Sequence, residues 1–246
     1  MKKLFLVLSL VLLSVTFLSA DVYIKSNTHT GAVEMMGQKQ PAKDEVTEMW
    51  IGDGKFTTIT SGQSMTLDLN KMKMYIIYPE TKKYVETDLP LDMAKLMPEQ
   101  AAQMLSMMKI SATVTANGQT KKIGQWNCTG YNAEIKIQAM MEMKMNMTIW
   151  ASKDVPFDWK AYSEKMYPAI LKAQSGSMPF GDDIVNEFKK IEGFQIASEM
   201  SMNVMGANIH ITTEVQEISK KPAPAGIYAV PDGYTKQDKM TVKRGM

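Results

Sequence analysis

The sequence has few of the side chains on which most enzyme, disulfide and nucleic-acid sites depend. It contains one cysteine and two histidines, so an intrachain disulfide is impossible and stability must come from the core. Among its 28 basic residues only Arg244 is an arginine. The planar bidentate group that proteins use on phosphates and carboxylates is therefore missing from the body of the chain. We expect no nucleic-acid partner.

Motifs typical of common enzyme classes are absent as well. There is no G-x-S-x-G, no H-E-x-x-H, no phosphate-binding glycine loop and no pair of cysteines. Gly52-Asp53-Gly54 has no third spaced glycine and is typical of a hairpin turn. Cys128, two residues after Trp126, is typical of a small buried hydrophobe. We therefore expect neither an enzymatic activity nor a cofactor.

The first 20 residues have the layout of a secretory signal peptide. Two lysines precede an apolar run from Leu4 to Leu13, and the segment closes on Leu18-Ser19-Ala20. The run is shorter than the roughly 20 apolar residues that a membrane-spanning helix needs. We expect cleavage before Asp21, a periplasmic location, and a single domain over residues 21–246.

Methionine is the residue that this chain has in excess, with 24 copies. In the stretch 140–150 (MMEMKMNMTIW), the methionines at 141, 143, 145 and 147 alternate with polar residues. This period of two predicts a strand with one apolar face and one wetted face. Methionine is a weak strand former with a flexible, polarizable side chain, so the pattern favours a soft apolar lining that adapts to its contents.

The remaining patterns predict an antiparallel meander interrupted by helices. Strands are expected over Val22–Thr30, Glu45–Ile51, Lys55–Thr60, Met65–Leu69, Met72–Tyr78, Tyr84–Thr87, Ile110–Thr115, Lys121–Gly124, Asn127–Ile137, Glu199–Asn203 and Ile209–Ile218. Turns are expected at Asn117-Gly118 and Gly206-Ala207, and a loop over Gly31–Lys43. Helices are expected over Asp92–Met108, after an N-cap at Asp158 with a kink or a split at Pro168, and from Asp182 to Lys190.

Several short motifs in this order resemble one known superfamily. They are Asp68-Leu69 followed by Lys73-Met74-Tyr75, Pro79 to Tyr84, Gly124 to Cys128 leading to Tyr131, Ile149 to Ser152, and the ending Val230 to Tyr234. With the signal peptide in front, the chain resembles the LolA/LolB-like superfamily of bacterial periplasmic lipid and lipoprotein carriers. It is most similar to an uncharacterised secreted branch of that superfamily, a domain of unknown function.

The resemblance implies an α+β fold in which a curved antiparallel sheet forms an unclosed β-barrel and helices cover its concave face. It also implies an apolar cavity for acyl chains and a membrane-associated delivery partner. Known carriers in the superfamily use arginine and a mobile lid loop, whereas the body of this chain has no arginine. That departure weakens the case for lipoprotein chaperoning.

We therefore expect a binding protein that holds a hydrophobic small molecule or lipid between a methionine-rich sheet and a helical lid. The expected ligand-binding residues are Met72, Met74, Ile76, Met104, Leu105, Met108, Met141, Met143, Met145, Met147, Met200 and Met202. Three alternatives stay open at this point: the methionines are ordinary core, they bind a soft metal such as Cu(I) through their thioethers, or the chain is a structural envelope-interaction module. Only His29 and His210 could join a metal site as imidazoles.

Overall fold

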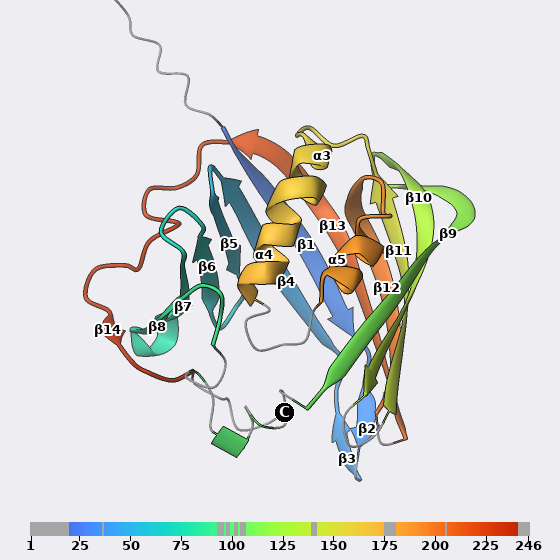
Figure 1. Cartoon of the computed structure of the whole chain (residues 1–246), viewed down its shortest axis with the longest axis horizontal. Helices are drawn as coiled ribbons and strands as arrows, with labels where there is room; N and C mark the ends of the chain where they lie inside the picture. Colours follow the sequence, from blue (N-terminus) through green and yellow to red (C-terminus); the bar gives the residue numbers. More distant parts are fainter. Residues whose placement is uncertain are drawn as a thin grey trace, which may run out of the picture.

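One large, curved antiparallel sheet forms the body of the protein, with short helices packed on its inner face (Figure 1). The structure is a computed structural model that describes residues 20–35, 37–92, 96, 99–100, 103, 107–138, 142–174, 181–204 and 206–240. Residues 1–19 of the expected signal peptide and most of the expected helix Asp92–Met108 lie outside these residues. No helix in the described ranges is both long and apolar enough to cross a membrane.

The sheet has twelve strands in the order β14-β8-β7-β6-β5-β4-β1-β13-β12-β11-β10-β9, and its two edge strands do not pair with each other. A separate hairpin, β2–β3, lies within the segment expected to be a loop. The strand bounds are β1 Asp21–Thr30, β2 Val33–Met35, β3 Gln38–Gln40, β4 Lys43–Gly52, β5 Lys55–Ile59, β6 Ser64–Asp68, β7 Lys73–Tyr78, β8 Lys83–Asp88, β9 Lys109–Ile123, β10 Trp126–Gln138, β11 Glu142–Ser152, β12 Phe194–Val204, β13 Ala207–Lys221 and β14 Thr235–Lys236.

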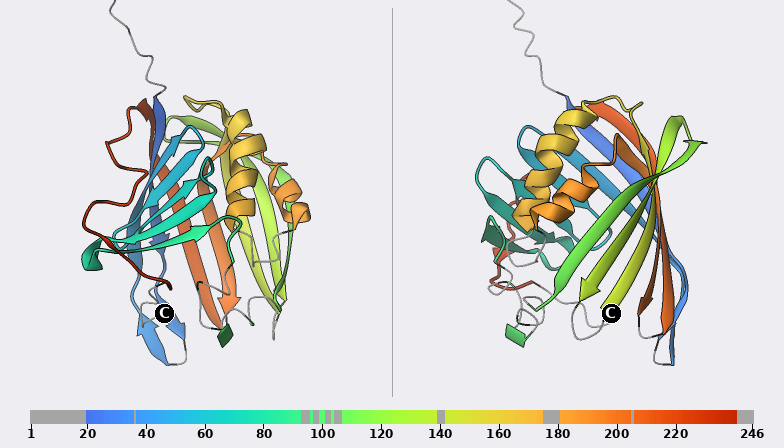
Figure 2. Two further views of the ribbon diagram at one scale, coloured as in Figure 1. Left: turned by 60° about the vertical axis from the view of Figure 1, so that its left-hand side comes forward. Right: turned by 45° about the vertical axis from the view of Figure 1, so that its right-hand side comes forward.

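The helices that follow β11 lie side by side on the inner face of the sheet (Figure 2). They are α3 (Trp159–Ala161), a π-helical turn (Tyr162–Met166), α4 (Tyr167–Gln174) and α5 (Asp182–Phe188), and a short 3-10 turn (Pro79–Thr81) precedes β8. The side chain of Asp158 accepts a hydrogen bond from the Ala161 backbone N–H at 3.0 Å, which confirms the expected N-cap.

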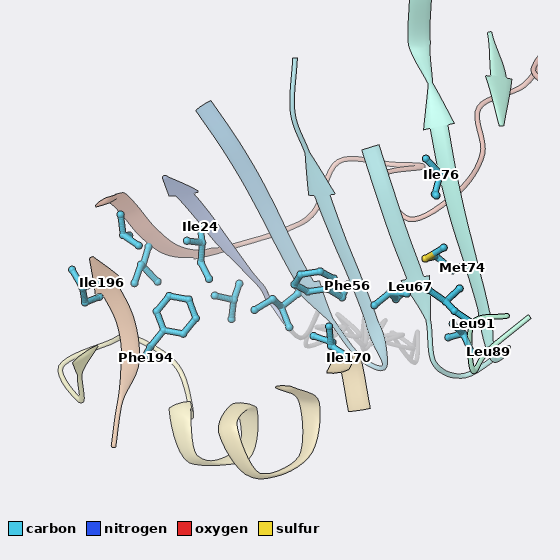
Figure 3. Close-up of a cluster of buried hydrophobic side chains, with 14 of the residues drawn as sticks. Ile24, Phe56, Leu67, Met74, Ile76, Leu89, Leu91, Ile170, Phe194 and Ile196 are labelled. Atoms are coloured by element: carbon cyan, nitrogen blue, oxygen red, sulfur yellow. The ribbon is translucent and has the colours of Figure 1, made fainter. Parts of the chain in front are cut away.

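The main core lies between α4 and the strands β1 and β4–β8. Ile170 of α4 points toward Phe56, and Leu67 and Met74 continue the same apolar cluster across β6 and β7 (Figure 3). Met74 is only 2% exposed. This half of the sheet is therefore packed against Ile170 of α4 and against Leu89 and Leu91, which follow β8 (Figure 3).

A second, smaller cluster lies between α5 and the long strands β9–β11. It contains Ile149, Ala133 and Val114, with Phe188 of α5 packed against it. The carboxylate of Glu187 accepts a hydrogen bond at 2.7 Å from the Val114 backbone N–H of the edge strand β9. That bond fixes α5 to the edge of the sheet.

The prediction of a turn at Asn117-Gly118 is wrong. β9 is a single strand of 15 residues, and its register against β10 shifts near Gly130, which is a β-bulge and not a reversal. Gly118 has φ +74° and supplies the left-handed backbone that the bulge needs. The same Asn-Gly pair that is typical of hairpins is therefore used here to bend a continuous strand.

The C-terminal tail crosses the sheet and ends as an added edge strand. The Thr57 hydroxyl donates to the Ile227 carbonyl at 3.4 Å on the way, and β14 then pairs in parallel with β8. The Thr235 backbone N–H donates to the Lys82 carbonyl at 2.9 Å. The edge of the sheet at β8 is thus covered by the chain itself.

Candidate ligand-binding site

The methionines of β11 and β12 lie on the inner face of the sheet, on the same side as α5. Strand register aligns them with apolar neighbours in three rows: Val114, Ala133, Met147, Met200 and Ile211; Ala112, Ile135, Met145, Met202 and Ile209; and Ile110, Ile137 and Met143. Because Met147 and Phe188 of α5 both pack against the smaller cluster, the whole set faces the helices. The period-two pattern therefore predicted their common face correctly.

Two pockets lie between this face and the helices. The first, which we call the tyrosine pocket, has a volume of about 240 Å³ and is lined by Ile24, Ser26, Met49, Tyr162, Ser163, Tyr167, Phe188, Ile191, Gly193, Phe194, Gln195, Ile196, Thr213 and Val215. The second, the aliphatic pocket, has a volume of about 250 Å³ and is lined by Ile110, Ala112, Ile135, Ile137, Met145, Tyr167, Ile184 and Phe188. Tyr167 and Phe188 line both pockets, so these two rings form the wall between them.

The expected ligand-binding residues divide between pocket, core and surface. Met145 lines the aliphatic pocket, and Met143, Met147, Met200 and Met202 are half-buried on the same face.

Met74 and Ile76 are part of the packed core and border neither pocket. Met72 has φ +53° in the turn before β7 and is 50% exposed, because the chain reverses there before the strand begins. Met108 is half-buried just before β9. Met104, Leu105 and Met141 lie outside the described residues.

Sequence reasoning missed the aromatic side of the site. The Tyr162 ring packs edge-to-face against Phe194 (centroids 5.4 Å apart, 68°) and Phe157 (6.1 Å, 85°), a geometry that aromatic pairs prefer. Tyr167 lies 6.1 Å from Tyr162, centroid to centroid. The apolar stripe of the helix after Asp158 was a usable signal, since a helix that covers a sheet presents its apolar side to whatever lies between the two layers.

A close backbone approach closes one side of the tyrosine pocket. Gly193 has φ +121°, and a Cβ there would lie 2.7 Å from the backbone carbonyl atoms of Ser152. No other residue fits that contact without a shift of the backbone. The Tyr131 hydroxyl accepts a hydrogen bond at 3.1 Å from the neighbouring Glu192 N–H, which ties the segment after α5 to β10.

Burial governs the electrostatics of the tyrosine pocket. It raises the pKa of Tyr162 well above its usual value, and the neighbouring Tyr167 raises it further. Burial also raises the pKa of Tyr167. Both phenols therefore stay protonated through the neutral range, and they can donate hydrogen bonds.

The family of the chain follows from comparison with known sequences. The model of a domain of unknown function, DUF4412, matches residues 27–234. The chain belongs to the DUF4412 family. No curated protein matches it. The matched range begins within β1 and ends just before β14. It includes every lining residue of the aliphatic pocket and all those of the tyrosine pocket except Ile24 and Ser26.

Proposed function

We propose that this DUF4412 protein is a secreted, periplasmic carrier that holds an apolar ligand, lipid acyl chains in particular, between the inner face of the sheet and helices α4 and α5. The observation that carries the proposal is the aliphatic pocket, whose walls are side chains of Ile, Ala, Met and Phe apart from one phenol. Each pocket alone is smaller than the roughly 300 to 1,000 Å³ typical of ligand sites, whereas the two joined fall within that range. Rotation of Tyr167 or Phe188 would join them.

Ligand release would require the helical layer to move away from the sheet. Among the hydrogen bonds between described residues, α5 and the segment after it are held to β9 and β10 by the Glu187–Val114 and Glu192–Tyr131 bonds. The half-buried methionines beside the pocket can change rotamer at little cost, which suits chains of different length. No covalent chemistry is needed.

The resemblance to LolA/LolB-like carriers favours a lipid-carrier function, and the signal-like N-terminus favours a periplasmic location. A carrier of this class would deliver its ligand to a membrane-associated partner. The absence of body arginines argues for a ligand other than a lipoprotein.

Blocking one pocket tests the proposal. Ala112 lines the aliphatic pocket from β9, and its neighbour Thr113 is exposed on the opposite face of the same strand. We expect Ala112→Trp to fill the pocket and abolish binding of N-phenyl-1-naphthylamine, a dye that fluoresces in apolar sites. The control Thr113→Trp adds the same ring to the same edge strand and should bind the dye as the wild type does. Equal dye binding by both variants would show that the dye does not bind in the aliphatic pocket and would contradict the proposal.

Soft-metal binding is a second candidate because the strand register pairs methionines directly. Met145 lies opposite Met202, and Met147 lies opposite Met200, at a spacing from which flexible thioethers can converge. Within the described ranges, no three His, Cys, Asp or Glu side chains gather to hold a metal ion. Titration with Cu(I) against a chelator distinguishes the two functions, since Met145→Leu with Met202→Leu would abolish metal binding and leave dye binding intact.

A further inference from the structure

The oxygen and nitrogen atoms that reach the two pockets belong to uncharged groups. Among the described residues that line either pocket, none carries a charged side chain. Two of the hydroxyls are already engaged: Thr213 hydrogen-bonds to Thr28 at 3.0 Å, and Ser163 donates to the Lys160 carbonyl at 3.2 Å. The groups still available to a ligand must be found among the remaining polar side chains.

Tyr162 and Tyr167 provide two such groups. Neither phenol hydroxyl is hydrogen-bonded to another residue in the part of the chain that the structure describes. The hydroxyl of Ser26, on β1 across the tyrosine pocket, likewise has no hydrogen bond to another described residue. Among the described residues, the fully buried side-chain atoms without a partner are Trp150 Nε1 and Tyr228 Oη, so these three oxygens are accessible from the pocket. They are therefore suited to a polar atom that arrives with a ligand.

The π-helical turn is what places both phenols on the pocket side. Pro168 has no N–H and so cannot make the ordinary helical bond to the carbonyl four residues earlier. The residue just before the proline, Tyr167, donates its N–H to the carbonyl of Tyr162, five residues back rather than four. In a regular α-helix, residues five apart point about 140° away from each other, whereas here the two rings lie 6.1 Å apart at 36°.

From this arrangement we infer that the ligand is an uncharged amphiphile, a single-chain alcohol or ester, whose oxygen lies between the Tyr162 and Tyr167 hydroxyls and whose alkyl chain passes Phe188 into the aliphatic pocket. The inference rests on the proposed function and specifies its ligand class. An anionic head group would enter a buried site that offers no countercharge, which is strongly unfavourable. The head group of a fatty acid would therefore have to enter protonated.

The raised pKa values of the two tyrosines agree with this selection. Burial disfavours the phenolate of Tyr162, and the same environment would disfavour a carboxylate beside it. The sign of the effect predicts that fatty-acid binding strengthens as pH falls toward the pKa of the acid. Alcohol binding should be independent of pH over the same range.

Three ligands with the same chain test the inference: dodecanol, dodecanoate and dodecane, each displacing N-phenyl-1-naphthylamine from the full-length mature protein at pH 8. We expect the dissociation constant of dodecanol to be at least tenfold lower than that of dodecanoate. The double variant Tyr162→Phe with Tyr167→Phe should bind dodecanol roughly tenfold more weakly, since two hydrogen bonds are lost, and dodecane unchanged. Tyr75→Phe, a half-buried tyrosine on β7 that borders neither pocket, is the control and should leave all three constants unchanged.

The outcomes separate this inference from the function on which it rests. If dodecanoate binds as tightly as dodecanol, or if the double variant keeps full affinity for dodecanol, the head-group inference is wrong and the carrier function stands. If neither the dye nor any of the three ligands binds, both are wrong. Unchanged dodecane affinity in the double variant shows that the pocket is still folded.

Discussion

Two isoleucines that differ in their relation to the aliphatic pocket give a direct stability test. Ile184, on α5, is 4% exposed and lines the pocket, whereas Ile149, on β11, is 0% exposed and packs in the smaller cluster away from both pockets. Replacing either by alanine removes three carbons, which costs about 2.4 kcal/mol in lost transfer free energy. The cost of the cavity left behind and the change in helix or strand preference differ between the two sites.

At Ile149 the substitution opens a new void in a packed cluster, which adds a cavity cost and brings the total to about 4 kcal/mol. Loss of a β-branched side chain from a strand adds a few tenths of a kcal/mol. Ile184 borders the pocket on one side, so its removal adds less cavity cost than the removal of Ile149, and alanine regains about 0.4 kcal/mol as the better helix former. We therefore expect about 2 kcal/mol at Ile184 and more than 4 kcal/mol at Ile149.

Urea unfolding monitored by circular dichroism measures both changes. The protein should first be refolded from denaturant, so that any ligand acquired during expression is removed and does not add to the apparent stability. The slope of free energy against urea must stay the same in both variants for the comparison to hold. Intrinsic helix and strand preferences alone account for about 1 kcal/mol of the difference in unfolding free energy between the two variants. A measured difference below that value would mean that Ile184 is as closely packed as Ile149 and that the pocket is closed.

Three further predictions concern single groups. The Lys190 ammonium and a β9 backbone N–H hold the pKa of Glu187 below its usual value, so its contribution to α5 stability is present above about pH 4.3 and is lost as pH falls through the lowered pKa. The hydrogen-exchange protection factors of the α5 amides, which correct for the intrinsic pH dependence of exchange, should therefore decrease on acidification, and Glu187→Gln should remove that decrease. Asp158→Ala removes the N-cap bond and should cost about 1 kcal/mol in thermal unfolding, with no loss meaning that the cap is not formed in solution. Burial raises the pKa of the Cys128 thiol, so iodoacetamide should modify it at pH 8 only after denaturant is added; rapid modification of the native protein would contradict the placement of the thiol in the core.

Alternation along the chain predicted most of the fold. The turns at 53–54 and 206 and the face shared by Met143, Met145 and Met147 follow from period-two patterning and glycine. Alternation assigns a side chain to a face, but it does not say what covers that face. Met74 and Met145 look alike in sequence, yet different segments cover them. Met74 packs in the cluster that contains Leu89 and Leu91 after β8, whereas Met145 faces the pocket beside α5.

The aromatic part of the site depends on a local helix irregularity, which residue spacing does not reveal. Pro168 predicted a kink or a split in this helix, and the structure has a π-helical turn between α3 and α4 just before the proline. Only that turn brings Tyr162 and Tyr167 together. The bulge at Gly118 is a similar case. The Asn117-Gly118 pair is compatible with either a hairpin turn or a bulge in a continuous strand, and the sequence does not distinguish the two.

The abundant methionines allow the central claim to be tested residue by residue. With ¹³C-labelled methionine methyl groups, addition of dodecanol should shift the NMR signals of Met145, in the aliphatic pocket, and Met49, in the tyrosine pocket. Met74 in the packed core and Met72 on the exposed turn should keep their chemical shifts. Shifts at Met72 without shifts at Met145 and Met49 would place the ligand on the outer surface and contradict a carrier that encloses its ligand between sheet and helices.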